Sequence, residues 1–322
     1  MITVKLTYPQ HWLKEDLPGN YLAQSPHEQG IWENYQFEIN QPKLKNCDFW
    51  VVNGNLDTKE TVKVNYATIF ISSEERTSKI WDDKFLQQFD WIVSSQEGIR
   101  HPQVIRTQYI CPWQVRKTYN ELIPQKSLPK PKDFSAVVSD MVATESHKKR
   151  FAFVNQLKGH FKDRLDWFGK GNVYIRDKWD GLSPYKYSIA FENTSSLHYW
   201  TEKIADCYLA LCMPIYWGCP NIADYFPEES MILLKPNDLQ ASIQAIEQAM
   251  EENRYEQNFD YILKAKDLVM NAYNIFPKLK AVLDDIRPGI SPNPKSVTLK
   301  PEYFFTREPL LKKVIRKIRQ QW

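Results

Sequence analysis

The sequence predicts an α/β fold made of two Rossmann-like domains. Short β-prone runs alternate with segments whose apolar residues recur at helical spacing, which is typical of βαβ units and parallel sheets. A polar, proline-rich stretch from Cys111 to Lys132 separates two such series. The 322 residues, 43% of them hydrophobic, suffice for two cores. We expect a first domain with linker over 1–132, a second domain over 133–290 and a basic tail over 291–322.

Composition excludes several classes of function. A net charge of +3 is too small to indicate nucleic-acid binding by the whole chain. The five cysteines form no CxxC pair and the six histidines have no metal-ligand spacing, so we expect reduced thiols and no metal site. We see neither a signal peptide nor a run of about 20 apolar residues, which favours a cytoplasmic protein.

The first domain is expected to place a carboxylate beside a cleft. Strands are predicted at Thr3–Leu6, Phe49–Val52, Thr68–Ile71 and Trp91–Val93, with a helix between Ile80 and Phe89. Glu74 and Glu75 follow the third of these strands, where a side chain can face a cleft. A solvated acid pair at the start of a helix would give the same pattern.

The second domain opens with features that suit a phosphate. A strand at Phe134–Val138 precedes a helix from about Ser146 to Phe161, and Arg150 lies near the start of that helix. A guanidinium can hold phosphate oxygens through two parallel hydrogen bonds, although a basic triplet can equally be solvated surface. The next strand begins at Leu165 and ends in a glycine turn at 169–171.

The stretch from Tyr185 to Pro227 reads as strand, polar loop, helix and strand. The strand Tyr187–Phe191 stops at a polar cluster, Thr201 can cap the helix that follows, and Pro214 is expected to end it. This order places four polar side chains around the start of a helix that follows a strand: Asn193, Tyr199, Glu202 and Lys203. Ligands bind at such positions in open α/β sheets, and a ribose diphosphate has the matching chemistry.

The same stretch resembles the donor-binding motif of the α-1,3/4-fucosyltransferases, glycosyltransferase family 10. The matching elements, in fixed order, are Tyr185-Lys186, Phe191-Glu192-Asn193, Thr201-Glu202-Lys203, and Pro214 to Gly218 followed by Pro220-Asn221. The resemblance implies a GT-B fold and an inverting transfer of L-fucose from GDP-fucose to an acceptor glycan. Animal members of this family typically carry an N-terminal membrane anchor and a stem, which we do not see in this sequence, so we expect a bacterial-type member.

The resemblance also implies roles for individual residues. Glu74 aligns with the general base, with Glu75 as the alternative, and Arg150 with an arginine that contacts the donor diphosphate. Glu202 would accept hydrogen bonds from the ribose and Lys203 would meet the charge of the leaving GDP. The remaining residues expected to bind the donor are Tyr185, Lys186, Asn193 and Tyr199.

No Asp-x-Asp motif is present, so we expect that no cofactor is required, with a divalent metal as a possible stimulant. The linkage, 1,3 or 1,4, stays open, and we expect an acceptor such as GlcNAc or Glc of a bacterial surface polysaccharide, for example lipopolysaccharide. Two alternatives remain: the same fold with another nucleotide sugar, or an inactive nucleotide- or glycan-binding protein.

The C-terminal stretch Pro309 to Trp322 predicts a basic amphipathic helix. Its apolar residues form one stripe and its lysines and arginines cover the rest, which suits an anionic lipid surface. We therefore expect peripheral contact with the inner face of the cytoplasmic membrane. The alternative is that this helix packs on the first domain.

Overall fold

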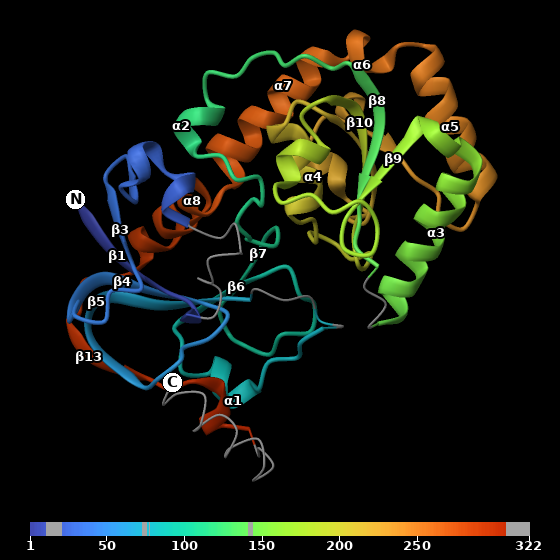
Figure 1. The fold of residues 1–322 in the computed structure, drawn as a ribbon. Helices are drawn as coiled ribbons and strands as arrows, with labels where there is room; N and C mark the ends of the chain where they lie inside the picture. Colours follow the sequence, from blue (N-terminus) through green and yellow to red (C-terminus); the bar gives the residue numbers. More distant parts are fainter. Residues whose placement is uncertain (11–20, 73–75, 77, 141–143, 307–322) are drawn as a thin grey trace.

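The computed structural model describes residues 1–10, 21–72, 76, 78–140 and 144–306. Two separate sheets form the centres of two α/β lobes, which Figure 1 shows one above the other. The described chain passes from the first lobe to the second through residues 107–131, which include the short helix α2 (Tyr119–Leu122). The expected α/β architecture of two Rossmann-like domains is confirmed.

The first sheet has the strand order β2-β3-β1-β4-β5-β6-β7, and β13 pairs with β5 outside this path. Its strands are β1 (Ile2–Thr7), β2 (Ile31–Trp32), β3 (Tyr35–Ile39), β4 (Asn46–Asn53), β5 (Glu60–Ile71), β6 (Trp91–Ser94), β7 (Val104–Arg106) and β13 (Lys295–Leu299). The strands from β3 to β7 along this order pair in parallel, so their carboxyl ends meet at one edge. The four predicted strands of this domain lie within β1, β4, β5 and β6.

The helix predicted between Ile80 and Phe89 is shorter than expected. Only α1 (Asp83–Leu86) forms, and the Asp82 side chain caps it by accepting from the N–H groups of Lys84 and Phe85. The rings of Trp81, Phe85 and Phe89 pack on Phe70 with centroid distances of 4.9 to 5.3 Å. The apolar spacing in this segment therefore reflects the burial of these rings against β5. Only one helical turn forms within the segment.

The second sheet is parallel throughout, with the order β12-β11-β10-β8-β9. Its strands are β8 (Lys132–Val137), β9 (Leu165–Phe168), β10 (Tyr185–Phe191), β11 (Met213–Trp217) and β12 (Ile232–Leu233). The helices of this lobe are α3 (Glu145–Phe161), α4 (Glu202–Leu209), α5 (Leu239–Glu251), α6 (Arg254–Gln257) and α7 (Phe259–Leu268). The expected strands and the helix from about Ser146 are confirmed.

Pro214 does not end α4, which corrects the prediction from the sequence. The helix stops at Leu209, and Leu211 takes a left-handed backbone with φ of 53°. Pro214 lies inside β11, opposite Ser188 of β10. The change of backbone conformation at Leu211 therefore turns the chain before the proline is reached.

The chain returns to the first lobe after α7. A π-helical turn (Val269–Tyr273) precedes α8 (Ile275–Ile286), which Asn274 caps by accepting from the N–H of Phe276. Apolar residues of α8 share a core with β1, β3, β4 and β5, and β13 then pairs antiparallel with β5. Figure 1 shows α8 beside β3 and β1, and β13 beside β5. The expected boundary at residue 290 is therefore wrong, because residues 275–299 pack with the first domain.

The predicted amphipathic helix at Pro309 to Trp322 lies outside the described residues and stays a prediction. In the part of the chain that is described, no helix combines the length and apolar character needed to cross a bilayer.

Candidate functional site

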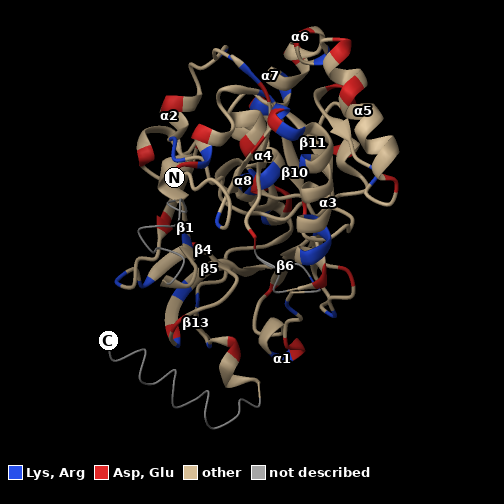
Figure 2. Ribbon diagram, turned by 45° about the vertical axis from the view of Figure 1, so that its right-hand side comes forward, with Lys and Arg blue, Asp and Glu red and all other residues tan. Residues whose placement is uncertain are grey.

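A cavity of about 300 Å³ opens beyond the carboxyl ends of β8 and β9, beside α3 and α4. It is lined by Gln114, Arg116, Val137, Val138, Ser139, Arg150, Gly169, Ile175, Arg176, Lys178, Glu202 and Lys203. Five of these side chains are basic and one, Glu202, is acidic. Figure 2 shows basic and acidic positions side by side around α4. A concave site with this charge favours a ligand that carries negative oxygens.

The start of α4 is built around the buried carboxylate of Glu192, which directly follows β10. This carboxylate is 0% exposed and accepts from the Thr201 N–H at 2.8 Å and from the Thr201 hydroxyl at 2.9 Å. The Thr201 oxygen in turn caps α4 by accepting from the Lys203 N–H at 3.3 Å. Gly218 leaves room for Glu192, because a Cβ there would lie 2.3 Å from the Glu192 Cγ. The strand and the helix are thus joined by side-chain hydrogen bonds.

Lys203 lies between two carboxylates. Its Nζ is 3.2 Å from Glu192 and 3.3 Å from Glu202, and it also donates to the Thr201 hydroxyl at 3.0 Å. Burial acts to lower the pKa of Lys203, but Glu192 and Glu202 outweigh burial and raise it. Burial acts to raise the pKa of Glu202, but Lys203 and Lys178 lower it to about 2. Both side chains are therefore charged at neutral pH.

Arg150 brings a guanidinium to the same cavity from α3. It is 7% exposed, and its Nη1 donates to the Asn193 side-chain oxygen at 2.6 Å. Its buried Nε has no hydrogen-bond partner among the described residues. A buried donor without an acceptor is costly, so this nitrogen is suited to an acceptor brought by a ligand.

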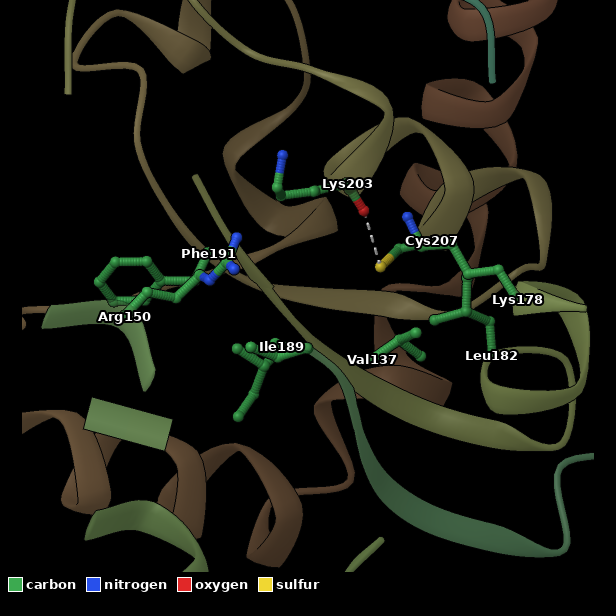
Figure 3. A pocket seen from close by; sticks show the side chains of 9 residues that line it. Val137, Arg150, Lys178, Leu182, Ile189, Phe191, Lys203 and Cys207 are labelled. Carbon is green, nitrogen blue, oxygen red and sulfur yellow. Dashed lines mark hydrogen bonds between the residues drawn. The ribbon is translucent and has the colours of Figure 1, made fainter. Parts of the chain in front are cut away.

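A smaller hollow of about 20 Å³ adjoins the main cavity, and Figure 3 shows its lining. Lys203 and Cys207 come from α4, where the Cys207 thiol donates to the Lys203 carbonyl at 3.3 Å. Arg150 and Phe191 lie to the left in this view, and Lys178 and Leu182 lie to the right. Three cationic side chains, Arg150, Lys178 and Lys203, therefore line both this hollow and the main cavity.

Two further charged residues at this site, Lys178 and Asp206, were not identified from the sequence. Lys178, which begins a 3₁₀ turn at Lys178–Gly181, donates to Asp206 at 2.7 Å. The Asp206 side chain is 0% exposed and also accepts from the Gln114 N–H at 2.9 Å. Asp206 could have been recognised from the sequence, because it is the only acidic residue in the otherwise apolar segment 204–209 of α4. Nothing in the spacing of Lys178 identifies it.

Tyr185 and Lys186, expected at the donor site, lie at the amino end of β10. The Tyr185 hydroxyl donates to Asp166 at 2.6 Å, and Lys186 pairs with Glu256 of α6 at 2.6 Å. Since β10 spans Tyr185–Phe191 and a strand rises about 3.3 Å per residue, they lie roughly 20 Å from its carboxyl end. Neither lines the cavity, and we assign both a structural role.

Tyr199 packs against the connection between the two domains. It is 7% exposed, its ring lies 5.4 Å from that of Tyr109, and the neighbouring His198 carbonyl accepts from the Tyr109 N–H at 3.1 Å. Tyr199 is not among the residues that line the 300 Å³ cavity. Its loop borders the space between the two lobes instead.

A second cavity, of about 340 Å³, lies between the two domains. Its lining comes from the first domain (Arg76, Ser95, Gln96 and Glu97) and the second (Ser195, Ser196, Leu197 and Pro220). Glu74 and Glu75 lie outside the described residues. The flanking Ser72 follows the carboxyl end of β5, and Arg76 reaches this cavity. The described residues on either side of the two glutamates therefore lie at the end of β5 and at the space between the domains.

Within the described ranges, no three or more histidine, cysteine, aspartate or glutamate side chains are grouped so that they could hold a metal ion.

One segment of the chain matches the model of a known protein family. Residues 127–272 match the model of the C-terminal domain of glycosyltransferase family 10 (fucosyltransferase). This match starts just before β8 and ends inside the π-helical turn, where the chain leaves the second lobe.

Curated relatives match over shorter segments. An alpha-(1,3)-fucosyltransferase of Helicobacter pylori is 43% identical over 58 residues, which cover 18% of this chain and 12% of that protein. A GDP-fucose protein O-fucosyltransferase 3 of Bos taurus is 31% identical over 90 residues, 26% of this chain and 18% of that protein. The chain thus spans less than a fifth of the length of these relatives.

One solved structure resembles nearly the whole chain. The crystal structure of an alpha1,3-fucosyltransferase aligns with a TM-score of 0.54 and 18% identity over 89% of each chain. The likeness confirms the expected GT-B fold, in which two Rossmann-like domains face each other.

Proposed function

We propose that the chain transfers L-fucose from GDP-fucose to a hydroxyl of an acceptor glycan, because residues 127–272 match the model of the C-terminal domain of glycosyltransferase family 10. The observation that carries the proposal is the 300 Å³ cavity at the start of α4, with Arg150 and Lys203 in its lining. Both residues lie within the family segment. This is the position where open α/β sheets bind nucleotides.

The charge around the cavity supports a nucleotide-sugar donor, whose diphosphate carries two negative charges. The lining offers five basic side chains and Glu202, with the buried Glu192 and Asp206 behind them. The basic side chains therefore outnumber the acidic ones, which favours a negatively charged diphosphate. We propose that these fixed cations stabilise the departing GDP and that the reaction requires no cofactor, with a divalent metal as a possible stimulant.

We assign the chemistry to one displacement with inversion at the anomeric carbon. Glu74, or its neighbour Glu75, takes the proton from the acceptor hydroxyl as the hydroxyl oxygen attacks this carbon. The bond from fucose to GDP breaks on the opposite face, and Arg150 and Lys203 meet the charge that develops on GDP. Glu202 accepts hydrogen bonds from the ribose hydroxyls, and Asn193 and Tyr199 lie near the nucleotide or the transferred sugar.

We place the acceptor in the 340 Å³ cavity between the domains. The hydroxyls of the serines in its lining can hydrogen-bond to sugar hydroxyls, and Arg76, which follows Glu74 and Glu75 in the sequence, also lines it. We propose GlcNAc or Glc of a bacterial surface polysaccharide, such as lipopolysaccharide, as the acceptor, joined through a 1,3 or 1,4 linkage.

The decisive experiment incubates the protein with GDP-fucose on a glycan array and measures GDP release and product mass. We expect one fucose residue added per GDP released. Lys203→Ala should lower kcat by roughly 10²- to 10³-fold, since a fixed positive charge that stabilises the departing GDP is lost. Unchanged turnover in this variant would contradict the assignment of Lys203.

Two outcomes would favour the alternatives. A thermal-shift screen against GDP, UDP and CMP sugars that selects a donor other than GDP-fucose would indicate the same fold with another nucleotide sugar. Tight binding of GDP-fucose without GDP release on any acceptor would indicate an inactive binding protein.

We also propose that the protein works in the cytoplasm, attached to the inner face of the membrane through Pro309 to Trp322. This rests on the basic and apolar pattern of that segment. The full chain should sediment with vesicles that contain anionic phospholipid, and a variant lacking these residues should stay in the supernatant. Equal sedimentation of both forms would argue that the segment packs on the protein.

A further inference from the structure

Beyond Arg150 and Lys203, we infer that Lys178 donates directly to the phosphate oxygens of the donor and that Asp206 positions Lys178 for this contact. The inference rests on the proposed function, because it concerns the same nucleotide-sugar site. Lys178 follows an irregular loop after β9, while Asp206 lies in the second turn of α4. The two are 28 residues apart and meet only in the folded chain.

Lys178 is placed where the donor would sit. Its side chain is 16% exposed and lines both the 300 Å³ cavity and the smaller hollow beside it. It shares these linings with Arg150 and Lys203. A ligand that contacts Arg150 and Lys203 in this space therefore also lies close to Lys178.

The hydrogen bonds of the two lysines differ in a way that favours Lys178. The Lys203 ammonium has three acceptors within the protein, on Glu192, Thr201 and Glu202, which match its three N–H groups. The Lys178 ammonium has one acceptor among the described residues, Asp206 at 2.7 Å. Two of its N–H groups are therefore available to phosphate oxygens, whereas Lys203 acts mainly through its charge.

Asp206 is fixed from two sides, which qualifies it as a positioning residue. One carboxylate oxygen accepts from the backbone N–H of Gln114, at 2.9 Å, and the other accepts from Lys178. Gln114 belongs to the connection between the domains and lines the cavity itself. The carboxylate is 0% exposed, so water cannot replace either partner. Asp206 thereby holds the Lys178 ammonium at the cavity wall.

The test compares the binding of GDP, GMP and guanosine by titration calorimetry. Lys178→Gln should weaken GDP binding roughly tenfold to a hundredfold, as expected when a charged hydrogen bond is lost. Guanosine binding should stay within about twofold, because guanosine has no phosphate. Lys178→Arg, which keeps the charge and donors, should restore most of the GDP affinity.

Asp206 is tested through its dependence on Lys178. Asp206→Asn should also weaken GDP binding selectively, and adding it to Lys178→Gln should cause no further loss. Lys280→Gln is the matched control, since Lys280 is a partly buried lysine of α8 that pairs with Asp284 at 2.8 Å, away from the cavity. It should leave the affinities for GDP and guanosine unchanged.

The outcomes separate the inference from the proposed function. If Lys178→Gln binds GDP as tightly as the wild type while Lys203→Ala binds it weakly, the inference is wrong and the proposed function stands. Equal weakening of GDP and guanosine would also overturn the inference, because it would indicate a structural role. Failure of the wild type to bind GDP would refute both.

Discussion

Glu202 shows how the environment of a single residue determines its charge. It is the first residue of α4, its side chain is 15% exposed, and its carboxylate lies 3.3 Å from the Lys203 ammonium. Burial opposes ionisation, but the two neighbouring ammonium groups of Lys203 and Lys178 prevail and lower its pKa from 4.5 to about 2. Its ionised form is thus favoured more in the folded chain than in the unfolded one.

We predict a pH-dependent effect of Glu202→Gln on the free energy of unfolding. Because the pKa is lowered on folding, the carboxylate stabilises the protein above about pH 4.5, and this stabilisation is lost as the pH falls towards 2. The wild type should exceed the variant by up to roughly 3 kcal/mol near pH 6, and the difference should shrink towards pH 2. Urea unfolding across this pH range measures the difference.

Glu145→Gln is the matched control for this measurement. Glu145 is also the first residue of a helix behind a threonine cap, but its side chain is 80% exposed. The control should change the free energy of unfolding by less than about 1 kcal/mol. A difference between wild type and Glu202→Gln that stays constant with pH would contradict the assigned ion pairs.

At the scale of elements, α3 and α4 begin in the same way but are joined to the sheet differently. Thr144 caps α3 and Thr201 caps α4, each accepting from a backbone N–H in the first turn. The two caps differ in one hydrogen bond. Among the hydrogen bonds of the described residues, Thr201 also donates to the buried carboxylate of Glu192, which follows β10, whereas Thr144 has no such bond. The cap of α4 therefore also fixes the strand to the helix on which Lys203 lies.

Replacing each threonine by alanine should separate these two contributions. Thr144→Ala should cost about 1 kcal/mol of stability, the usual value for a lost cap. Thr201→Ala should cost roughly 2–4 kcal/mol, since it also deprives a buried carboxylate of a donor. Chemical denaturation of both variants measures the costs. Equal losses would show that the hydrogen bond between Thr201 and Glu192 adds nothing.

At the scale of the whole molecule, the C-terminal part of the chain completes the first domain. The segment 275–286 forms α8 in the first core, and β13 pairs with β5 along five residues. Leu299, at the end of β13, is 0% exposed and packs in a cluster with Val62, Val64 and Leu86. The first domain therefore needs residues that follow the second domain in the sequence.

Leu299→Ala should destabilise the first domain by about 2–5 kcal/mol, the usual cost of removing a buried leucine side chain. Hydrogen exchange should show lost protection in β4 and β5, with β10 and β11 less affected. Leu233→Ala, at a position that is 52% exposed on β12, is the control and should cost less than about 1 kcal/mol. Unaltered protection of β5 would instead support the independent tail that the sequence predicted.

Several elements were predictable because their signals are local. Apolar runs located β4, β6, β8 and β10, and the cap at Thr201 located the start of α4. The polar residues after β10 indicated where a ligand with anionic oxygens would bind, and Arg150, Glu202 and Lys203 do meet at one cavity. Alternation, capping and strand ends depend on neighbours within a few residues, so the sequence alone determines them.

Only the tertiary structure decided which distant residues meet. It paired Lys178 with Asp206, returned α8 and β13 to the first domain, and placed Tyr185 and Lys186 at the far end of β10. These placements depend on how the sheets and helices pack. Residues that are close in the sequence can also lie at opposite ends of one strand. Packing is set by many contacts distant in sequence, which no local pattern of residues records.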